Sequence, residues 1–140
     1  DHVIRHSGRV DYETPDSVFA PLMREFSFTL DAAANEYNTK CTRWFGEHDD
    51  GLLQDWSDET VWLNPPYGPR IGVWVHKCYE SANNGATVVA LIPVNSDTSW
   101  WHKYVIGKAE VRFIRGRIRF QGMRNKTPFP LAVVVWRSMR

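Results

Sequence analysis

A short apolar run that ends in two successive prolines is the feature that most restricts how this chain can fold. Residues 61–63 have the composition of a buried strand, and Asn64, Pro65, Pro66 and Tyr67 follow them directly. Two prolines fix two φ angles and remove two N–H donors, so the hydrogen-bond ladder of the strand must stop there. The chain therefore contains a strand that ends in a rigid polar segment, residues 64–67, which we call the elbow.

The residue types in the elbow suit a planar amino group. The side-chain carbonyl of Asn64 and the backbone carbonyl of Pro65 are hydrogen-bond acceptors, and Tyr67 offers a flat aromatic face. Such acceptors would hold the hydrogens of an exocyclic amine on a base and present its nitrogen lone pair to an electrophile. We expect Asn64 to touch this ligand and to contribute little to the fold. The alternative is a proline-stiffened turn between a strand and a helix.

Periodicity along the rest of the chain predicts an α/β protein. Strands that alternate with helices are typical of a mostly parallel sheet with helices on both faces, here with an antiparallel end. Residues 1–12 show no periodicity, and we interpret them as an N-terminal arm before a single domain, residues 13–140. The predicted elements are a helix capped by Thr14 with Pro15 as its first residue, a helix at 71–82, a hairpin at 110–120, and strands at 26–30, 42–45, 61–63, 86–92 and 131–136.

A second candidate site follows the predicted strand at 26–30. That strand delivers Asp31 to its carboxyl end, which is the edge where open α/β sheets bind ligands. The small residues Ala32 and Ala33 come next and would let a ligand approach the backbone. The sequence therefore predicts a binding site at this edge of the sheet.

The charge of the chain is unevenly distributed. Residues 103–140 hold ten of the seventeen Lys and Arg residues and one of the sixteen acidic residues. Within them Arg115, Arg117 and Arg119 alternate with other residue types around a glycine, which suggests arginines on one side of a hairpin that meets phosphates or base edges. A solvated face, or an internal partner for the acidic half, is the alternative. Trp100 and Trp101 are adjacent and cannot both face one core if this stretch is helical, so we expect one of them to be a stacking or edge residue.

Several classes of protein are disfavoured by composition. Cys41 and Cys78 are the only cysteines, and they lack the spacing of a zinc site or a disulfide framework. We therefore expect no metal. The chain has neither an apolar run long enough to span a bilayer nor a signal-peptide pattern at its start, so we expect no membrane association and an intracellular location.

The motifs, taken in order, resemble those of the phage-type DNA N6-adenine methyltransferases, which depend on S-adenosylmethionine. The resemblance covers nearly the whole chain. It rests on five segments, which are Glu13-Thr14-Pro15, Phe28-Thr29-Leu30-Asp31-Ala32-Ala33-Ala34, Gly51-Leu52-Leu53-Gln54-Asp55-Trp56, Asn64-Pro65-Pro66-Tyr67 and residues 113–120.

The resemblance implies a trimmed Rossmann-like methyltransferase sheet and duplex DNA with a flipped adenine as substrate. It also implies a phage or prophage protein in the cytoplasm of a bacterial host. The implied catalytic residues are Asn64, Pro65, Pro66 and Tyr67; those near S-adenosylmethionine are Thr14, Pro15, Asp31, Ala32, Ala33 and Asp55; and those near DNA are Trp100, Arg115, Arg117 and Arg119.

The chain departs from the wider methyltransferase pattern at one point. Most relatives have a GxG-type loop after the first strand, whereas this chain has three alanines, and alanine does not adopt positive φ freely. Two other hypotheses thus stay open. One is a methyltransferase that acts on an RNA base or a glutamine amide, and the other is a nucleic-acid-binding module that has lost catalysis. The sequence does not indicate the recognition site or the oligomeric state.

Overall fold

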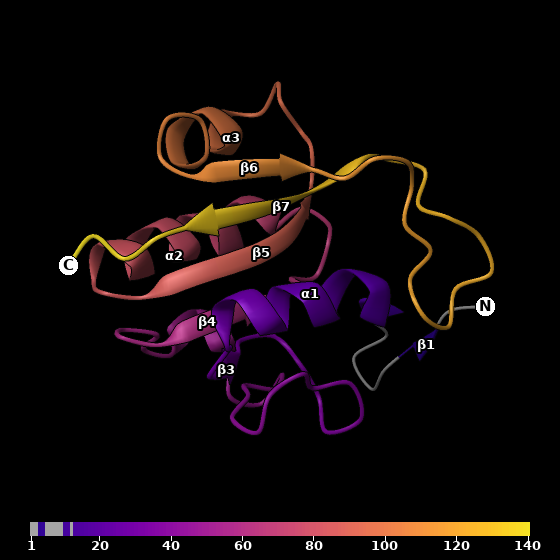
Figure 1. Ribbon diagram of the computed structural model, residues 1–140, viewed down its shortest axis with the longest axis horizontal. Coiled ribbons are helices and arrows are strands. Elements are labelled where there is room, and N and C mark those ends of the chain that lie inside the picture. Colours follow the sequence, from indigo (N-terminus) through magenta and orange to yellow (C-terminus); the bar gives the residue numbers. More distant parts are fainter. Residues whose placement is uncertain (1–2, 5–9, 12) are drawn as a thin grey trace.

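The computed structural model describes residues 3–4, 10–11 and 13–140, and its centre is a five-stranded sheet (Figure 1). The strands lie in the order β3-β4-β5-β7-β6. Their bounds are β3 Leu30–Asp31, β4 Thr60–Leu63, β5 Thr87–Pro93, β6 Glu110–Phe113 and β7 Leu131–Trp136; the helices are α1 Asp16–Phe26, α2 Ile71–Asn83 and α3 Ser99–Tyr104, with a 3-10 turn, η1, at Gly51–Leu53.

Strand directions confirm a mostly parallel sheet with an antiparallel end. β3, β4 and β5 are parallel neighbours, whereas β7 pairs antiparallel with both β5 and β6. β7 therefore runs against the other four strands. The continuous apolar runs predicted as strands at 61–63, 86–92 and 131–136 correspond to β4, β5 and β7.

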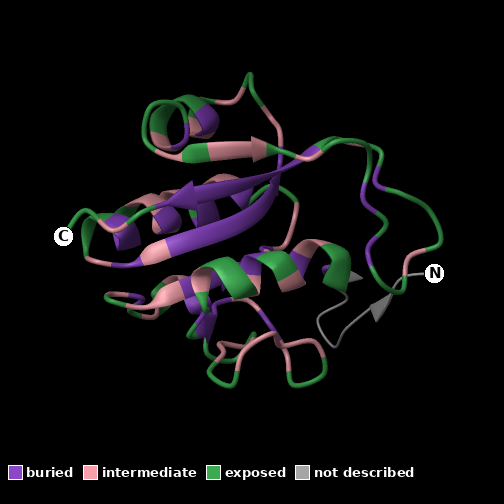
Figure 2. Cartoon of the chain, in the orientation of Figure 1, coloured by how far each residue is buried: buried purple, intermediate pink, exposed green. Residues whose placement is uncertain are grey.

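Helices cover both faces of the sheet, as expected. Alternate residues of β5 point to opposite sides, so Val88 and Ala90 pack with α2 and α3, while Val89 and Leu91 pack with α1. Figure 2 shows β5 and β7 as almost entirely buried between these layers. Cys78 of α2 is wholly buried in the first of these cores, and burial raises the pKa of its thiol.

The N-terminal region differs in part from the prediction. β1 (Val3–Ile4) pairs antiparallel with β2 (Val10–Asp11) in a small separate sheet, and the rest of the predicted arm lies outside the described residues. The prediction that Thr14 caps α1 was wrong, because Pro15 occupies the N-cap position and makes no side-chain cap bond. Thr14 is only 1% exposed, and its hydroxyl accepts a hydrogen bond from the elbow instead.

The predicted strands at 26–30 and 42–45 are much shorter in the structure. α1 continues to Phe26 and ends at Ser27, which has a φ of 54° and donates its N–H to the Met23 carbonyl. Only Leu30 and Asp31 then pair with β4. At 42–45 there is a single parallel bridge, between Asp31 and Trp44, which extends the sheet beyond β3.

The predicted hairpin at 110–120 was wrong. β6 pairs with β7, and residues 114–130 leave the sheet as a long loop, which we call the basic loop. Residues 117–120 do not turn back to pair with β6, which lies at the edge of the sheet beside β7. Ile118 and Phe120 are instead buried on the α1 side. In Figure 1 the basic loop reaches the start of α1, where Gln121 forms a bridge with Glu13.

Candidate functional site

A cavity of about 390 Å³ lies at the carboxyl ends of β3 and β4, beside the start of α2. Three segments that are distant in sequence form its walls, and the elbow belongs to one of them. The lining residues are Ala32, Ala33, Ala34, Phe45, Gly46, Glu47, Asp50, Gly51, Leu52, Pro66, Tyr67, Gly68, Pro69, Arg70 and Trp74. The sheet edge predicted from Asp31 and the elbow is therefore the edge where the cavity lies.

A glycine permits close backbone approach in this cavity, but it does not belong to the loop after β3. A Cβ atom on Gly51 would lie 2.2 Å from the carbonyl oxygen of Ala32, so any side chain there would force the two segments apart. The indole of Trp56 donates a hydrogen bond of 2.9 Å to the Gly51 carbonyl and holds this segment in place. Thus Ala32 and Ala33 can form the wall without a GxG loop, because the facing segment supplies the space.

Asp31 supports the cavity wall from behind and does not line the cavity. It is 3% exposed, and its carboxylate accepts the N–H groups of Lys40, at 2.9 Å, and Ala33, at 3.4 Å. Burial raises the pKa of Asp31 to about 7, against the lowering effect of these two N–H donors. Its carboxyl group therefore fixes the loop that follows β3.

The elbow is tied to the rest of the fold at Asn64. Its Nδ2 atom donates a hydrogen bond of 3.1 Å to Oγ1 of Thr14, which directly precedes α1. Pro65 is buried and Pro66 lines the cavity. The expectation that Asn64 contributes little to the fold was therefore wrong, because its amide joins the end of β4 to the segment that enters α1.

Tyr67 lies between the cavity and the basic loop. Its hydroxyl donates a hydrogen bond of 2.8 Å to the Leu91 carbonyl of β5. Its ring meets Phe120 and Phe129 of the basic loop edge-on, at centroid distances of 6.1 and 5.9 Å. The ring is held by the sheet at its hydroxyl end and by aromatic contacts from the loop, and it also lines the cavity.

The residues predicted to bind the cofactor are only partly brought together. Ala32 and Ala33 line the cavity, whereas Thr14, Pro15 and Asp31 do not. Asp55 does not line it either, because its exposed carboxylate faces Ser57, whose N–H bonds to it at 2.8 Å and whose contacts lower its pKa.

Two acidic residues that line the cavity, Glu47 and Asp50, were missed by the sequence analysis. Asp50 has a φ of 52°, and its side chain accepts the N–H of Leu52 at 3.2 Å. The only signal in the sequence was the turn pattern at residues 49–51, which does not indicate a ligand.

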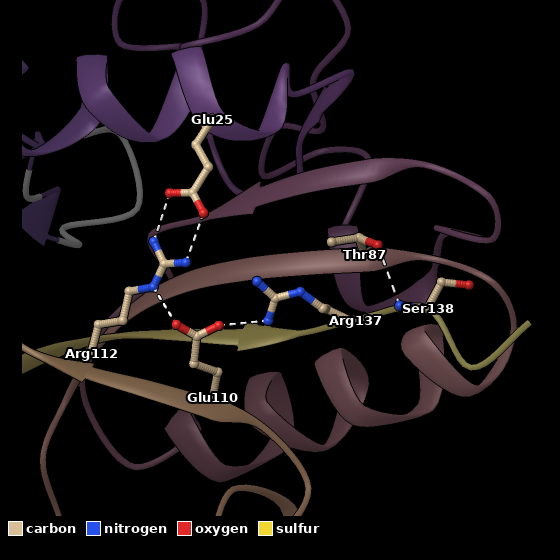
Figure 3. A network of polar contacts seen from close by, with 6 residues as sticks. All are labelled: Glu25, Thr87, Glu110, Arg112, Arg137 and Ser138. Atoms are coloured by element: carbon tan, nitrogen blue, oxygen red, sulfur yellow. Dashed lines mark hydrogen bonds and ion pairs between the residues drawn. The ribbon is translucent and has the colours of Figure 1, made fainter.

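Two groups of basic residues in the C-terminal third differ in their partners. In the first, the Arg112 guanidinium makes two bonds of 2.7 Å to Glu25 of α1 and one of 2.6 Å to Glu110, which also bonds to Arg137 at 2.6 Å (Figure 3). Arg112 holds the pKa of both carboxyl groups below their usual values. The alternative interpretation holds for Arg112, which pairs with Glu25 of the acidic half, whereas Arg137 pairs with Glu110 inside the basic third itself.

The second group faces solvent on the basic loop. Arg115, Arg117 and Arg119 are exposed, and within residues 13–140 they form no ion pair. Ile118 and Phe120 between and after them are buried, so the alternation seen in the sequence is real although the hairpin is not. These arginines remain candidates for contact with phosphates.

The two adjacent tryptophans of α3 differ in burial, as expected. Trp101 is 3% exposed and belongs to the core. Trp100 is half-buried and covers Gly72 of α2, where a Cβ atom would lie 2.9 Å from its ring. Trp100 is therefore an edge residue packed on α2.

The described residues hold neither a metal-binding cluster nor a membrane-spanning helix. Among residues 3–4, 10–11 and 13–140, no group of three or more His, Cys, Asp or Glu side chains could hold a metal ion. In the same part of the chain, every helix is too short or too polar to cross a membrane.

Comparison with known proteins adds a family match. The model of the family described as DNA N-6-adenine-methyltransferase (Dam) matches residues 3–133. A protein of Haemophilus phage HP1, named DNA N-6-adenine-methyltransferase, is 31% identical over 119 residues, which are 83% of this chain and 68% of that protein. A protein of the same name from Escherichia phage T1 is 31% identical over 105 residues. That match covers 74% of this chain but only 44% of the T1 protein, so the chain corresponds to less than half of that relative.

Proposed function

The chain belongs to the DNA N-6-adenine-methyltransferase (Dam) family, and we propose that it transfers a methyl group from S-adenosylmethionine to the N6 amino group of adenine in DNA. The observation that carries this proposal is the shared wall between the elbow and the cavity. Pro66 and Tyr67 line the cavity, and Asn64 and Pro65 directly precede them. An amine held at the elbow would therefore lie beside a ligand in the cavity.

The residues of the cavity suit the cofactor. Its volume falls within the usual range for small-molecule sites, and its lining mixes flat or apolar groups, such as Phe45 and Trp74, with charged ones. Glu47 and Asp50 line the cavity, and their carboxylates would accept from ribose hydroxyls, while Arg70 at the same site would donate to a carboxylate. S-adenosylmethionine supplies a methyl group on a positively charged sulfur, which is the electrophile that this reaction needs.

The elbow residues would orient the target amine. The adenine must leave its stack to reach them, and the Tyr67 ring would pack on the flipped base. The Asn64 side chain and the Pro65 carbonyl would accept the two amino hydrogens, which directs the nitrogen toward the cavity. Holding the nitrogen in this geometry supplies most of the acceleration that the chain provides.

The exposed arginines of the basic loop would hold the DNA. Arg115, Arg117 and Arg119 would bind the DNA backbone next to the elbow, since the same loop packs on Tyr67 through Phe120 and Phe129.

We also propose that residues 13–140 are a single domain with a trimmed Rossmann-like sheet. The phage origin of both relatives supports a phage or prophage protein that acts in the bacterial host.

Methyl transfer to defined substrates tests this proposal. Labelled S-adenosylmethionine would be incubated with duplex DNA, RNA of the same sequence and a glutamine-containing peptide, followed by nucleoside and amino-acid analysis. We expect label in N6-methyladenine from DNA. Label only in RNA or peptide would favour the other amino-group substrates, and an absence of saturable cofactor binding by calorimetry would favour a binding module without catalysis.

A further inference from the structure

Thr14 contacts the elbow in a way that the cofactor-binding role implied by the family resemblance does not explain. Its side chain is 1% exposed and does not line the cavity. Its Oγ1 accepts the hydrogen bond from Asn64 Nδ2 at 3.1 Å, although fifty residues separate the two in sequence. A buried hydroxyl that bonds a proposed substrate-contacting amide is placed to act on that amide.

An asparagine amide has two ends of similar shape and opposite hydrogen-bonding character. The nitrogen can only donate and the oxygen can only accept, so a group that accepts from the nitrogen fixes which end points away from it. A threonine hydroxyl can donate as well as accept, and in the structure it accepts from the Asn64 nitrogen. Target amine recognition needs the oxygen, because the amino hydrogens of adenine are donors. In the orientation that the structure shows, the Thr14 hydroxyl holds the nitrogen end, and the oxygen end points away from Thr14.

The acceptor is itself held in place. Pro15 follows Thr14 with a φ of −67° and leads directly into α1. On the other side, the carbonyl of Glu13 accepts the N–H of Gln121 at 2.9 Å, and the Glu13 carboxylate lies 3.8 Å from Lys40 Nζ. Thr14 thus lies between a helix start and a bridge to the basic loop, and its β-branched side chain has restricted rotamers.

We propose that Thr14 is a positioning residue for methyl transfer, whose hydroxyl holds the Asn64 amide with its oxygen toward the target amine. This inference rests on the proposed function, because it gives Asn64 the role of accepting from adenine. It differs from the cofactor role implied by resemblance, since it places the action of Thr14 on Asn64 and not on S-adenosylmethionine.

Two variants separate the hydroxyl from the shape of the side chain. Thr14→Val keeps the branched shape and removes the acceptor, whereas Thr14→Ser keeps the acceptor. Thr87→Val is a matched control, because Thr87 Oγ1 likewise accepts one hydrogen bond, from the Ser138 N–H at 3.3 Å, at the amino end of β5 (Figure 3). We expect single-turnover rates at saturating cofactor and DNA to fall about tenfold in Thr14→Val and to stay near wild type in the other two.

A second readout needs neither cofactor nor DNA. The side-chain NH₂ signals of Asn64, assigned by their loss in Asn64→Asp, report the bond to Thr14 directly. In Thr14→Val we expect their hydrogen exchange to speed up about five- to tenfold, the size expected when one neutral hydrogen bond is removed, with no change in Thr14→Ser or Thr87→Val. If wild-type protein methylates no adenine while these signals behave as expected, the proposed function fails and the Thr14–Asn64 contact stands.

A double-mutant cycle gives the decisive comparison. On an Asn64→Ala background, Thr14→Val should have no further effect on the single-turnover rate, because the amide that it positions is gone. An equal rate loss with and without Asn64 would overturn the inference. So would a Thr14→Val protein whose rate at saturating cofactor is normal and whose only defect is weaker binding of S-adenosylmethionine.

Discussion

The cavity and the basic loop are built in different ways. The cavity lies at the ends of paired strands, and its walls are fixed by backbone contacts such as the one between Gly51 and Ala32. The basic loop joins no strand of the sheet and is held by the bridge between Gln121 and Glu13 and by a few buried side chains, including Ile118, Phe120 and Thr127. Rigid walls suit the positioning of reacting atoms, whereas a loop anchored at a few points suits contact with a long charged backbone.

The two regions meet at the elbow. Tyr67 bonds to the Leu91 carbonyl in the sheet and touches Phe120 and Phe129 in the basic loop. The difference between the regions suggests a division of work, in which changes in the loop alter DNA affinity and changes at the elbow alter the rate of the chemical step.

Replacing Asn64 should have the largest effect. Asn64→Ala removes an acceptor at the reacting nitrogen, and removal of one such polar group from a preorganised site costs on the order of two to four kcal/mol, about 10² to 10³ in rate. Asn64→Asp should be milder, because a carboxylate still accepts. Single-turnover rates measured beside melting temperatures check this, and rates that merely follow stability across the variants would mean that the elbow is scaffold.

Removing the exposed arginines should have the next largest effect, and on affinity. Replacing Arg115, Arg117 and Arg119 together by Gln should flatten the dependence of log affinity on log salt, by about 0.9 for each DNA phosphate that the variant no longer neutralises. The double variant Arg112→Gln with Arg137→Gln is the control, because both arginines pair with Glu110. A wild-type slope in the triple variant would contradict the assignment of the loop to DNA.

The structure and the sequence point to different acidic residues as contacts of the cofactor, and two variants distinguish them. Glu47→Gln should weaken binding of S-adenosylmethionine by several-fold, because Glu47 lines the cavity and the variant lacks its charge. Asp55→Asn should leave that affinity unchanged, since Asp55 bonds to Ser57 instead. Calorimetric titration of both variants with S-adenosylmethionine measures the two affinities. Weaker binding in Asp55→Asn than in Glu47→Gln would support Asp55 as the cofactor residue.

Asp31 should give an effect on stability that depends on pH. Its pKa is raised from 3.8 to about 7 in the fold, so the folded protein binds this proton more strongly than the unfolded chain does. The stability that this contributes is fully present below about pH 4 and is lost as the pH rises through about 7. Denaturant unfolding from pH 5 to 8 should therefore show wild type losing stability relative to Asp31→Asn, and parallel curves would contradict the raised pKa.

The sequence predicts the sheet well where composition alone decides. β5 and β7 are continuous runs of branched apolar residues, and α2 has a clear apolar face. The strand predicted at 26–30 is too long, because Phe26 belongs to the end of α1 and the chain enters β3 only at Leu30. The hairpin fails for another reason, since alternation at 117–120 indicates a half-buried extended segment but not its partner.

The site can be predicted from the sequence only where the residues of a motif fix the local backbone themselves. The prolines of the elbow fix the backbone locally, so the position of Asn64 and Tyr67 at a strand end could be expected. The choice of Asp50 over Asp55 as a cavity residue depends on how Gly51 packs against Ala32, which no local pattern encodes. The contact between Thr14 and Asn64 is equally invisible in sequence, because it joins residues that are far apart in the chain.

The most direct test of this division measures both DNA affinity and single-turnover rate in two variants, one changed at the elbow and one in the basic loop. We expect Asn64→Ala to bind duplex DNA and S-adenosylmethionine like wild type and to lose the methyl-transfer rate. We expect the Arg115, Arg117 and Arg119 triple variant to bind DNA weakly and to recover a nearly normal rate once DNA is saturating. Loss of rate at saturation in the triple variant, or a normal rate in Asn64→Ala, would contradict the account.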